Sequence, residues 1–103
     1  MPFKDITAQH EGLFIGIFGK IASVQFVPQY DSVWLNSGDL TEPSICIPLD
    51  NTALLLYRFE IDDVGYFANA NVLILGTVRI SQFGKKYIVL ENPKHFMVDF
   101  FRD

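Results

Sequence analysis

Residues 71–91 read NVLILGTVRISQFGKKYIVLE, two runs of alternating side chains separated by a turn. In the first run one side is apolar throughout, whereas the other becomes polar at Thr77 and Arg79, which is the period-two alternation of a β-strand. The glycine-containing segment Ser81–Lys85 predicts a hairpin turn. Because glycine weakens a strand, Gly76 is expected where the strand bends, as in a sheet that curls into a barrel. The stretch therefore predicts a long hairpin in a small β-barrel.

Length and composition bound the class of protein. The chain has 103 residues, 50% of them hydrophobic and 15% aromatic, which predicts a single folded domain over residues 1–103. No run approaches the roughly 18 uncharged apolar residues of a membrane span, and the N-terminus lacks the pattern of a signal peptide. The formal net charge of −4 argues against a strongly basic nucleic-acid-binding protein. Any contact with nucleic acid is therefore expected through a local patch or beside a basic partner.

The residues that bind metals, cofactors or disulfide partners are sparse. The single cysteine, Cys46, cannot form an internal disulfide and fits a reducing, intracellular compartment. It lies in SICIP, a predicted strand, and is expected to be a buried, unreactive thiol. His10 has no neighbour at a metal-ligand spacing, so no metal site is predicted. Gly12, Gly16 and Gly19 lack the spacing of a dinucleotide-binding loop, so no cofactor is predicted either.

The other segments alternate in the same way, with one exception. After a lead-in over residues 1–11, Leu13–Val27 predicts a long first strand that bends at its glycines. Ser32–Asn36 and Ile45–Leu49 predict two shorter strands. The exception is Thr52–Ile61, where apolar residues recur at helical spacing behind candidate N-cap residues, so a helix is expected there.

The C-terminal run His95–Phe101, HFMVDFF, alternates again and predicts either a final strand or a helix within residues 94–101. If the run is extended, both of its sides are largely apolar, and a small barrel can cover only one of them. If it is helical, two phenylalanines four residues apart form an apolar stripe. Exposed apolar surface commonly marks an interaction site. The predicted interface with a protein partner therefore comprises Phe96, Met97, Val98, Phe100 and Phe101.

The predicted order of elements is three strands, one helix and two strands, with the helix between the third and fourth strands. This is the order of the OB-fold, a five-stranded Greek-key barrel, so the predicted fold class is all-β with one helix. The barrel is expected over residues 13–91. The segments FGKIASV, DSVWLNSGD and NVLILGTVRIS with GKKYIVLEN resemble strands of OB-fold domains that bind single-stranded nucleic acid.

At this length the chain resembles the small single-OB subunits of replication protein A and of the telomeric CST complex. That resemblance implies a non-catalytic, nuclear subunit of a single-stranded DNA-binding complex in replication or telomere maintenance. It also implies a hetero-oligomer with a larger OB-fold protein, in which this chain acts mainly through protein–protein contacts. Single-stranded DNA is expected to bind weakly or only through the complex, and no membrane is involved.

OB barrels place ligands on their second and third strands, between the loop that joins the first two strands and the loop that joins the last two. Here those loops are Pro28–Asp31 and Ser81–Lys86. Aromatic side chains that stack on bases, with cations to meet phosphate, provide the chemistry of single-strand binding. The alternatives are a tryptophan buried in the core and lysines in an ordinary solvated turn. The predicted nucleic-acid-binding residues are Tyr30, Trp34, Arg79, Phe83, Lys85, Lys86 and Lys20.

A catalytic signature is missing from the sequence. Asp62 and Asp63 are adjacent, so they would face opposite ways in a strand, and neither His10 nor His95 has a nearby nucleophile. The sequence therefore predicts no enzyme. Two classes of function remain: the DNA-binding subunit described above, and an OB-like bacterial or phage accessory module that binds other proteins without any nucleic-acid role.

Overall fold

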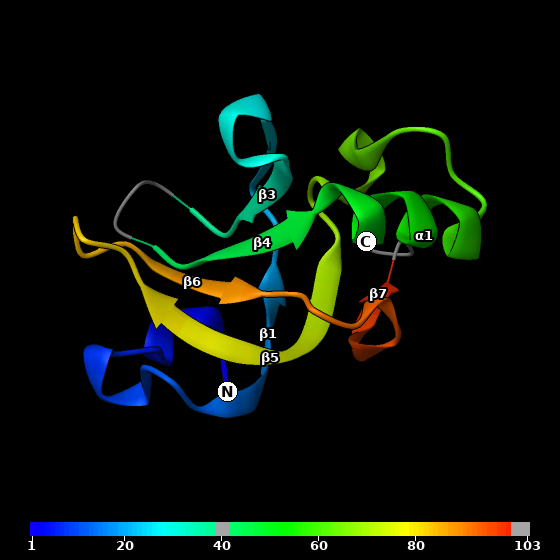
Figure 1. Ribbon diagram of the computed structural model, residues 1–103. Coiled ribbons are helices and arrows are strands. Elements are labelled where there is room, and N and C mark those ends of the chain that lie inside the picture. The colour runs from blue at the N-terminus through cyan, green and yellow to red at the C-terminus, as the bar shows by residue number, and fades with distance from the viewer. Residues whose placement is uncertain (39–41, 100–103) are drawn as a thin grey trace.

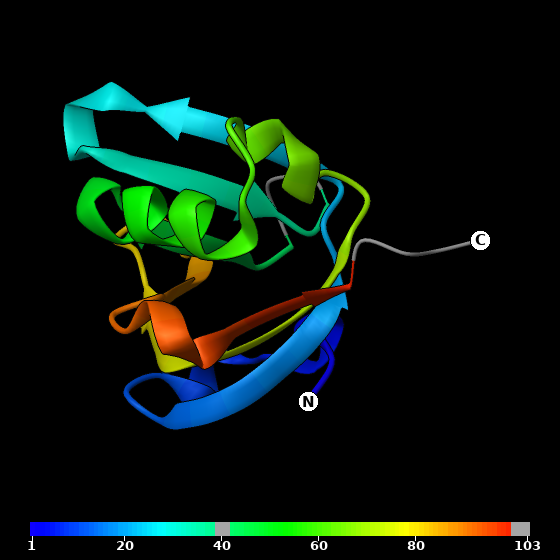
Figure 2. The ribbon, with the colours of Figure 1, turned by 90° about the vertical axis from the view of Figure 1, so that its right-hand side faces the viewer.

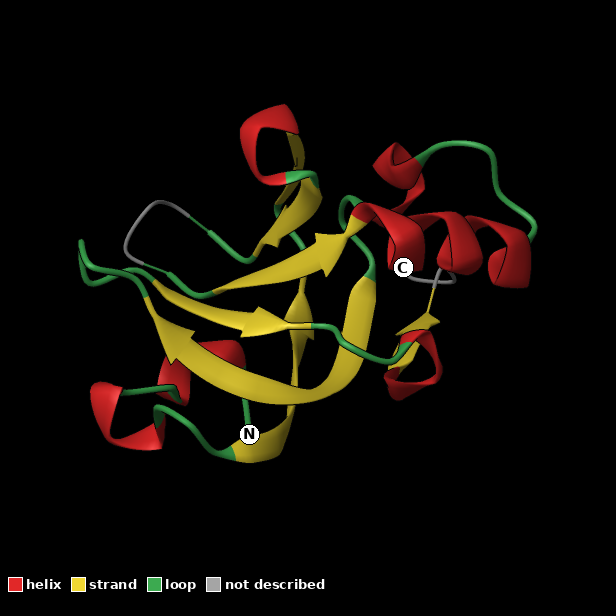
Figure 3. Cartoon of the chain, in the orientation of Figure 1, coloured by secondary structure: helices red, strands yellow, loops and turns green. Residues whose placement is uncertain are grey.

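The computed structural model describes residues 1–38 and 42–99. Among them are one α-helix, α1 (Leu49–Phe59), and seven strands (Figure 1). The strands are β1 (Phe14–Lys20), β2 (Ser23–Val27), β3 (Ser32–Asn36), β4 (Ser44–Pro48), β5 (Asn71–Ile80), β6 (Lys86–Val89) and β7 (Phe96–Asp99). Short 3-10 helices precede β1 and lie in the connections between later elements (Figure 3): η1 (Phe3–Asp5), η2 (Ala8–His10), η3 (Pro28–Tyr30), η4 (Val64–Phe67) and η5 (Pro93–His95). The prediction of a mostly β protein with one helix is confirmed for this part of the chain.

The strands form one sheet in the order β1-β5-β6-β4-β3-β2, with β7 also paired to β5. All neighbours are antiparallel except β4 and β6, which are parallel. The two ends of this order, β1 and β2, follow each other in the chain. Ile21 donates a backbone hydrogen bond to Ala70 beside β5, and the next residue, Ala22, donates to Asn36 in β3. The chain thus changes partner within two residues, and the sheet curls round (Figure 2).

The described residues contain seven strands rather than the five predicted for the barrel, because one expected strand is interrupted and the C-terminal segment, predicted as a strand or a helix, forms a strand. Leu13–Val27 is divided at Ile21–Ala22, where the partner changes, rather than at its glycines. The C-terminal segment forms the strand β7, which pairs with Asn71–Ile74 along the same edge of β5 on which β6 pairs with Thr77–Ile80. The fold is therefore OB-like, and a closed five-stranded Greek-key barrel stays a prediction.

Gly76 lies where the partner of β5 passes from β7 to β6, within the strongly curved strand of Figure 1. A Cβ atom at this position would lie 2.5 Å from Cγ2 of Ile88 and 2.8 Å from the carbonyl oxygen of Val89. Real Cβ atoms do not approach a backbone carbonyl so closely. The glycine thus allows β6 to pack against β5, a more specific role than the predicted bend.

The helix begins three residues before its predicted start and ends two before its predicted end, at Leu49 and Phe59 instead of Thr52 and Ile61. Pro48 ends β4, because proline lacks the N–H that a longer strand ladder would need. The same residue occupies the N-cap position of α1. Thr52 lies inside the helix, where its hydroxyl donates to the carbonyl of Pro48 at 3.1 Å. Glu60 adopts a left-handed conformation with φ 56° and ends the helix.

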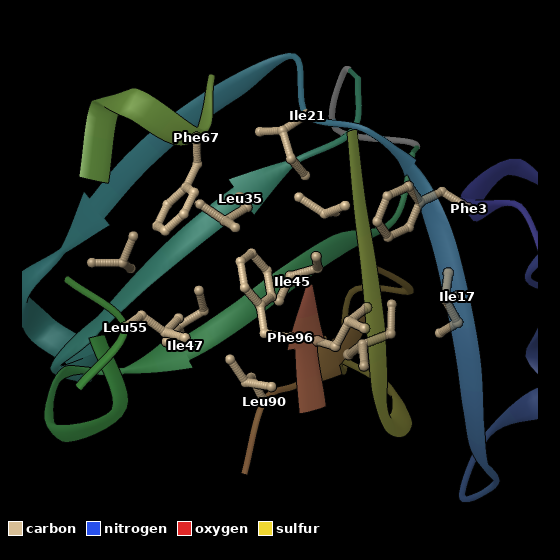
Figure 4. Packing of buried hydrophobic residues seen from close by; sticks show 14 of the residues in the cluster. Phe3, Ile17, Ile21, Leu35, Ile45, Ile47, Leu55, Phe67, Leu90 and Phe96 are labelled. Atoms are coloured by element: carbon tan, nitrogen blue, oxygen red, sulfur yellow. The ribbon is translucent and has the colours of Figure 1, made fainter. Parts of the chain in front are cut away.

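The core fills the inside of the curled sheet (Figure 4). Inward-facing side chains from the strands alternate with outward-facing ones, as period-two strands require. The lead-in over residues 1–11 also contributes, since Phe3 and Ile6 are buried. The fully buried side chains of the strands and of the linker after β1 include Ile17, Ile21, Leu35, Ile45, Ile47, Ile74 and Ile88.

Helix α1 covers one end of this core. Phe59 of the helix, Phe67 of η4 and Phe96 of β7 pack edge to face, with ring centroids 5.3–6.2 Å apart. Asn51 donates to the carbonyl of Leu90 at 2.9 Å. Arg58 donates to the carbonyls of Pro93 and Phe96, both at 2.8 Å. The helix therefore fixes the segment that carries β7. No helix in the described part of the chain is long and apolar enough to cross a membrane.

Candidate nucleic-acid interface

Outward-facing side chains form two rows across β2, β3, β4, β6 and β5, because directly opposite residues share a face of the sheet. The pairing register places the first row as Gln25, Trp34, Cys46, Val89 and Thr77. It places the second row as Ser23, Asn36, Ser44, Tyr87 and Arg79. The two rows together are called the Trp34 face below. The middle of the face lies on β3 and β4. These correspond to the second and third strands of an OB-fold, on which OB-folds bind ligands, because β1 and β2 together form the predicted first strand.

An aromatic pair lies at the centre of the Trp34 face. The rings of Trp34 and Tyr87 are 5.3 Å apart between centroids and inclined by 48°. The indole Nε1 of Trp34 donates to Oγ of Ser32 at 2.9 Å, which fixes the orientation of the ring. Trp34 is only partly buried, so it is not simply a core residue. Tyr87 was missed in the sequence, because only the parallel pairing of β4 with β6 brings it beside Trp34.

Hydrogen-bonding groups extend across the second row. Asn36 accepts from the hydroxyl of Ser44 at 2.7 Å and donates to the hydroxyl of Ser23 at 3.2 Å. At the other end of the row, the exposed Arg79 lies opposite Tyr87. Ser44 is fully buried, so its hydroxyl positions Asn36 and is not itself accessible. The face thus combines aromatic stacking surface with one exposed cation, which are the groups that contact bases and phosphates.

Two exposed aromatic residues lie at opposite ends of this face. Tyr30 is 72% exposed in η3, which precedes the first residue of β3. Phe83 is 88% exposed in the turn between β5 and β6. The hydroxyl of Ser81 accepts hydrogen bonds from the backbone of Phe83 and Lys85, which holds this turn. The two loops therefore lie at the two ends of the face, and a role for Tyr30 and Phe83 in nucleic-acid binding stays a prediction.

The three predicted lysines do not join the Trp34 face. Lys85 donates through Nζ to the backbone carbonyl of Glu42, and so ties the β5–β6 turn to the segment before β4. Lys86 pairs with Ile80, so it occupies the alternate position to Tyr87 along β6. Lys20 is exposed at the far end of β5, opposite Asn71. A role for any of them in nucleic-acid binding stays a prediction.

Cys46 lies next to Trp34 in the first row. It is partly buried rather than fully buried. Burial raises the pKa of its thiol, and a hydrogen bond with Ser32 acts in the opposite direction. The thiol therefore remains protonated at neutral pH, which agrees with the expected low reactivity. Within residues 1–38 and 42–99, no group of three or more His, Cys, Asp or Glu side chains could hold a metal ion.

The predicted partner interface is wrong for Phe96. β7 is a strand, and its register with β5 places Phe96 opposite Ile74 on the inward side, where it is fully buried. Val98 is partly buried and packs against the core. Met97 faces outward and is 44% exposed. Phe100 and Phe101 lie outside the described residues.

Comparison with known proteins shows the fold and nothing finer. No protein-family model matches the chain, and no curated protein matches it in sequence. Among solved structures, OBody AM1L10 bound to hen egg-white lysozyme matches with a TM-score of 0.64 and 16% identity, over 100% of this chain and 91% of that one. OBody AM3L15, also bound to hen egg-white lysozyme, matches with a TM-score of 0.58 and 13% identity, over 85% and 84%.

A chain of the S. pombe Stn1–Ten1 complex matches with a TM-score of 0.55 and 15% identity, over 87% of this chain. This chain spans 59% of the length of that one. These likenesses place the protein among OB-like folds, as the sheet order and the position of α1 between β4 and β5 also indicate.

Proposed function

We propose that this chain is a small, non-catalytic OB-fold subunit of a single-stranded DNA-binding complex in replication or telomere maintenance, located in the nucleus. The observation that carries the proposal is the Trp34–Tyr87 pair, in which Tyr87 lies opposite the exposed Arg79 on the outer face of the sheet. The likeness to a chain of the S. pombe Stn1–Ten1 complex supports the assignment to a telomere complex.

The chemistry of the Trp34 face fits a single strand. A base can stack on an aromatic ring that is fixed in place, because every base has a flat π surface. Arg79 can meet a phosphate beside the stacked base. The exposed ring of Phe83 can extend the stacking surface beyond β6. Such contacts tolerate any sequence, as binding without base readout requires.

The chain acts mainly through a larger OB-fold partner. The net charge of −4 repels a polyanion, and Arg79 is the one cation that the two rows of the Trp34 face contain. A partner with a basic surface would supply the remaining phosphate contacts. The isolated chain is therefore expected to bind single-stranded DNA weakly.

A titration of a labelled oligonucleotide of about 20 nucleotides, followed by fluorescence polarisation at low salt, tests the proposal. Phe83→Ala should weaken binding about fivefold or more, since one lost stacking contact is worth about 1–3 kcal/mol. Tyr57→Ala is the matched control, because Tyr57 is 86% exposed on α1, away from the Trp34 face. Equal affinities for the wild type and both variants would show that Phe83 is not part of the site. If the oligonucleotide does not bind at all, with or without the larger partner, the DNA-binding role is rejected.

A second candidate is a protein-binding OB module without any nucleic-acid role. The observation that favours it is that two chains of similar fold are each bound to lysozyme. The same titration separates the two candidates, because a protein-binding module would leave the polarisation of the oligonucleotide unchanged in the presence of its partner.

A further inference from the structure

An exposed apolar row crosses the outer face of β1, β5 and β7. The register aligns Phe18, Leu73 and Met97, which are 47%, 36% and 44% exposed. The adjacent row is polar: Lys20, Asn71 and Asp99 are aligned in the same way, and all three are exposed. These six residues are called the Leu73 face. A shallow hollow of about 300 Å³ lies on it, bounded by residues 71–73 and 97–99.

The Leu73 face is distinct from the Trp34 face, although β5 contributes to both. Leu73 and Arg79 are six positions apart on β5, which corresponds to roughly 20 Å along a strand. The curvature of β5 turns its two ends in different directions (Figure 1). A partner on the Leu73 face would therefore leave the aromatic pair accessible.

The charges of the Leu73 face are arranged symmetrically about β5. Lys20 lies on one side of Asn71 and Asp99 lies on the other, and Phe18 and Met97 flank Leu73 in the same way. If a second copy faces this surface across a two-fold axis parallel to β5, β1 of each copy lies over β7 of the other. Leu73 then meets Leu73 of the second copy, and each Phe18 meets a Met97.

The same operation brings Lys20 of each copy to Asp99 of the other, so two opposite-charge contacts form. Such a surface is self-complementary, which is the condition for an isologous dimer. We propose that two copies of this chain associate through the Leu73 face, with Leu73 on the two-fold axis. The face carries one cation and one anion, so the net charge of the chain does not concentrate there. This inference does not rest on the proposed function, because no nucleic acid takes part.

Sedimentation equilibrium over roughly 5 to 500 µM protein tests for the dimer, since mass action populates it as concentration rises. The wild type should change from monomer to dimer in this range. Lys20→Glu alone places two acidic pairs in the interface, and Asp99→Lys alone places two basic pairs there. Each variant should therefore weaken self-association by about tenfold or more.

Mixing the two variants gives the decisive result. In a mixed dimer, the new glutamate faces the new lysine, and the unchanged Asp99 faces the unchanged Lys20. The mixture should thus recover a dimer affinity within about threefold of the wild type, which only an isologous contact between these positions explains. Lys94→Glu is the matched control, because Lys94 is exposed on η5 outside the face and should leave the dimer unchanged.

The side chains at positions 20 and 99 are exposed, so circular dichroism should show that both variants remain folded. A wild type that stays monomeric up to the highest concentration would overturn the proposal. So would a mixture that stays monomeric, since the dimer would then use another surface. If the Leu73 face binds a different protein in place of a second copy, the purified wild type should stay monomeric, which is the first of these outcomes.

Discussion

Gly76 shows how a single missing methyl group determines the distance between two strands. A Cβ atom here would meet the carbonyl oxygen of Val89 at 2.8 Å, and a backbone atom cannot move aside as a flexible side chain can. We expect Gly76→Ala to lower the free energy of unfolding by about 1–3 kcal/mol, the usual cost of overpacking a core. Urea unfolding monitored by circular dichroism measures this.

The control for this substitution is Gly65→Ala. Gly65 is exposed in η4, and its nearest neighbour would be the carboxylate of Asp63 at 3.4 Å, an ordinary contact. The control should change stability by no more than about 0.5 kcal/mol. Similar losses for both variants would mean that the close approach of β6 is not what Gly76 allows.

Residue-level alternation could be predicted from the sequence, but which side is buried could be predicted only where the two sides differ in polarity. In β5 the apolar side that was predicted, with Val72, Ile74 and Val78, is the buried side. In β7 the alternation of Phe96 and Met97 was also correct, yet both sides are apolar, so the pattern does not say which side faces the core. The register with β5 decides it. The same lack of long-range information hid Tyr87, whose partner lies on another strand.

At the level of elements, α1 holds β7 in place through one side chain. Arg58 donates to the carbonyls of Pro93 and Phe96, and its guanidinium lies 4.7 Å from the centroid of the Phe59 ring. We expect Arg58→Ala to reduce stability by about 1–2 kcal/mol, because hydrogen bonds from a charged donor are lost at a partly solvated site. Amide hydrogen exchange at Phe96–Asp99 should become faster, which urea unfolding alone would not reveal.

Arg58→Lys is the informative comparison, since an ammonium group keeps the charge but lacks the planar fork that reaches two carbonyls. It should fall between the wild type and the alanine variant. If exchange in β7 is the same in all three proteins, the aromatic cluster of Phe59, Phe67 and Phe96 holds the strand without the arginine.

The type and order of the elements could be predicted, whereas their limits and number could not. The change from a period of two to helical spacing correctly placed one helix between β4 and β5. Its start was wrong because the prediction looked for a polar N-cap side chain, whereas Pro48, the last residue of β4, occupies the N-cap position without a side-chain hydrogen bond. The division of the first strand at Ile21–Ala22 follows from a change of partner, which no local pattern records.

At the scale of the whole molecule, the curvature of β5 separates two surfaces of different chemistry. Its C-terminal half contributes Arg79 to the Trp34 face, and its N-terminal half contributes Leu73 and Asn71 to the Leu73 face. A dimer through the Leu73 face would carry two Trp34 faces. Two linked sites can bind one long strand more tightly than either site alone, provided that the strand can span them.

The charge of the whole chain leads to the last prediction, which concerns salt. Because the net charge is −4, the isolated chain should bind single-stranded DNA through few phosphate contacts, and the logarithm of its affinity should fall only gently with the logarithm of salt concentration. Arg79→Ala should make this slope less negative by about 0.7, the value for one phosphate contact to a single strand. Lys94→Ala removes another exposed cation, on η5, and should leave the slope unchanged. If both variants change the slope equally, then the DNA senses only net charge, and the Trp34 face has no particular part in binding. Tight binding by the isolated wild type that resists salt would instead show that stacking dominates, and that a basic partner is not required.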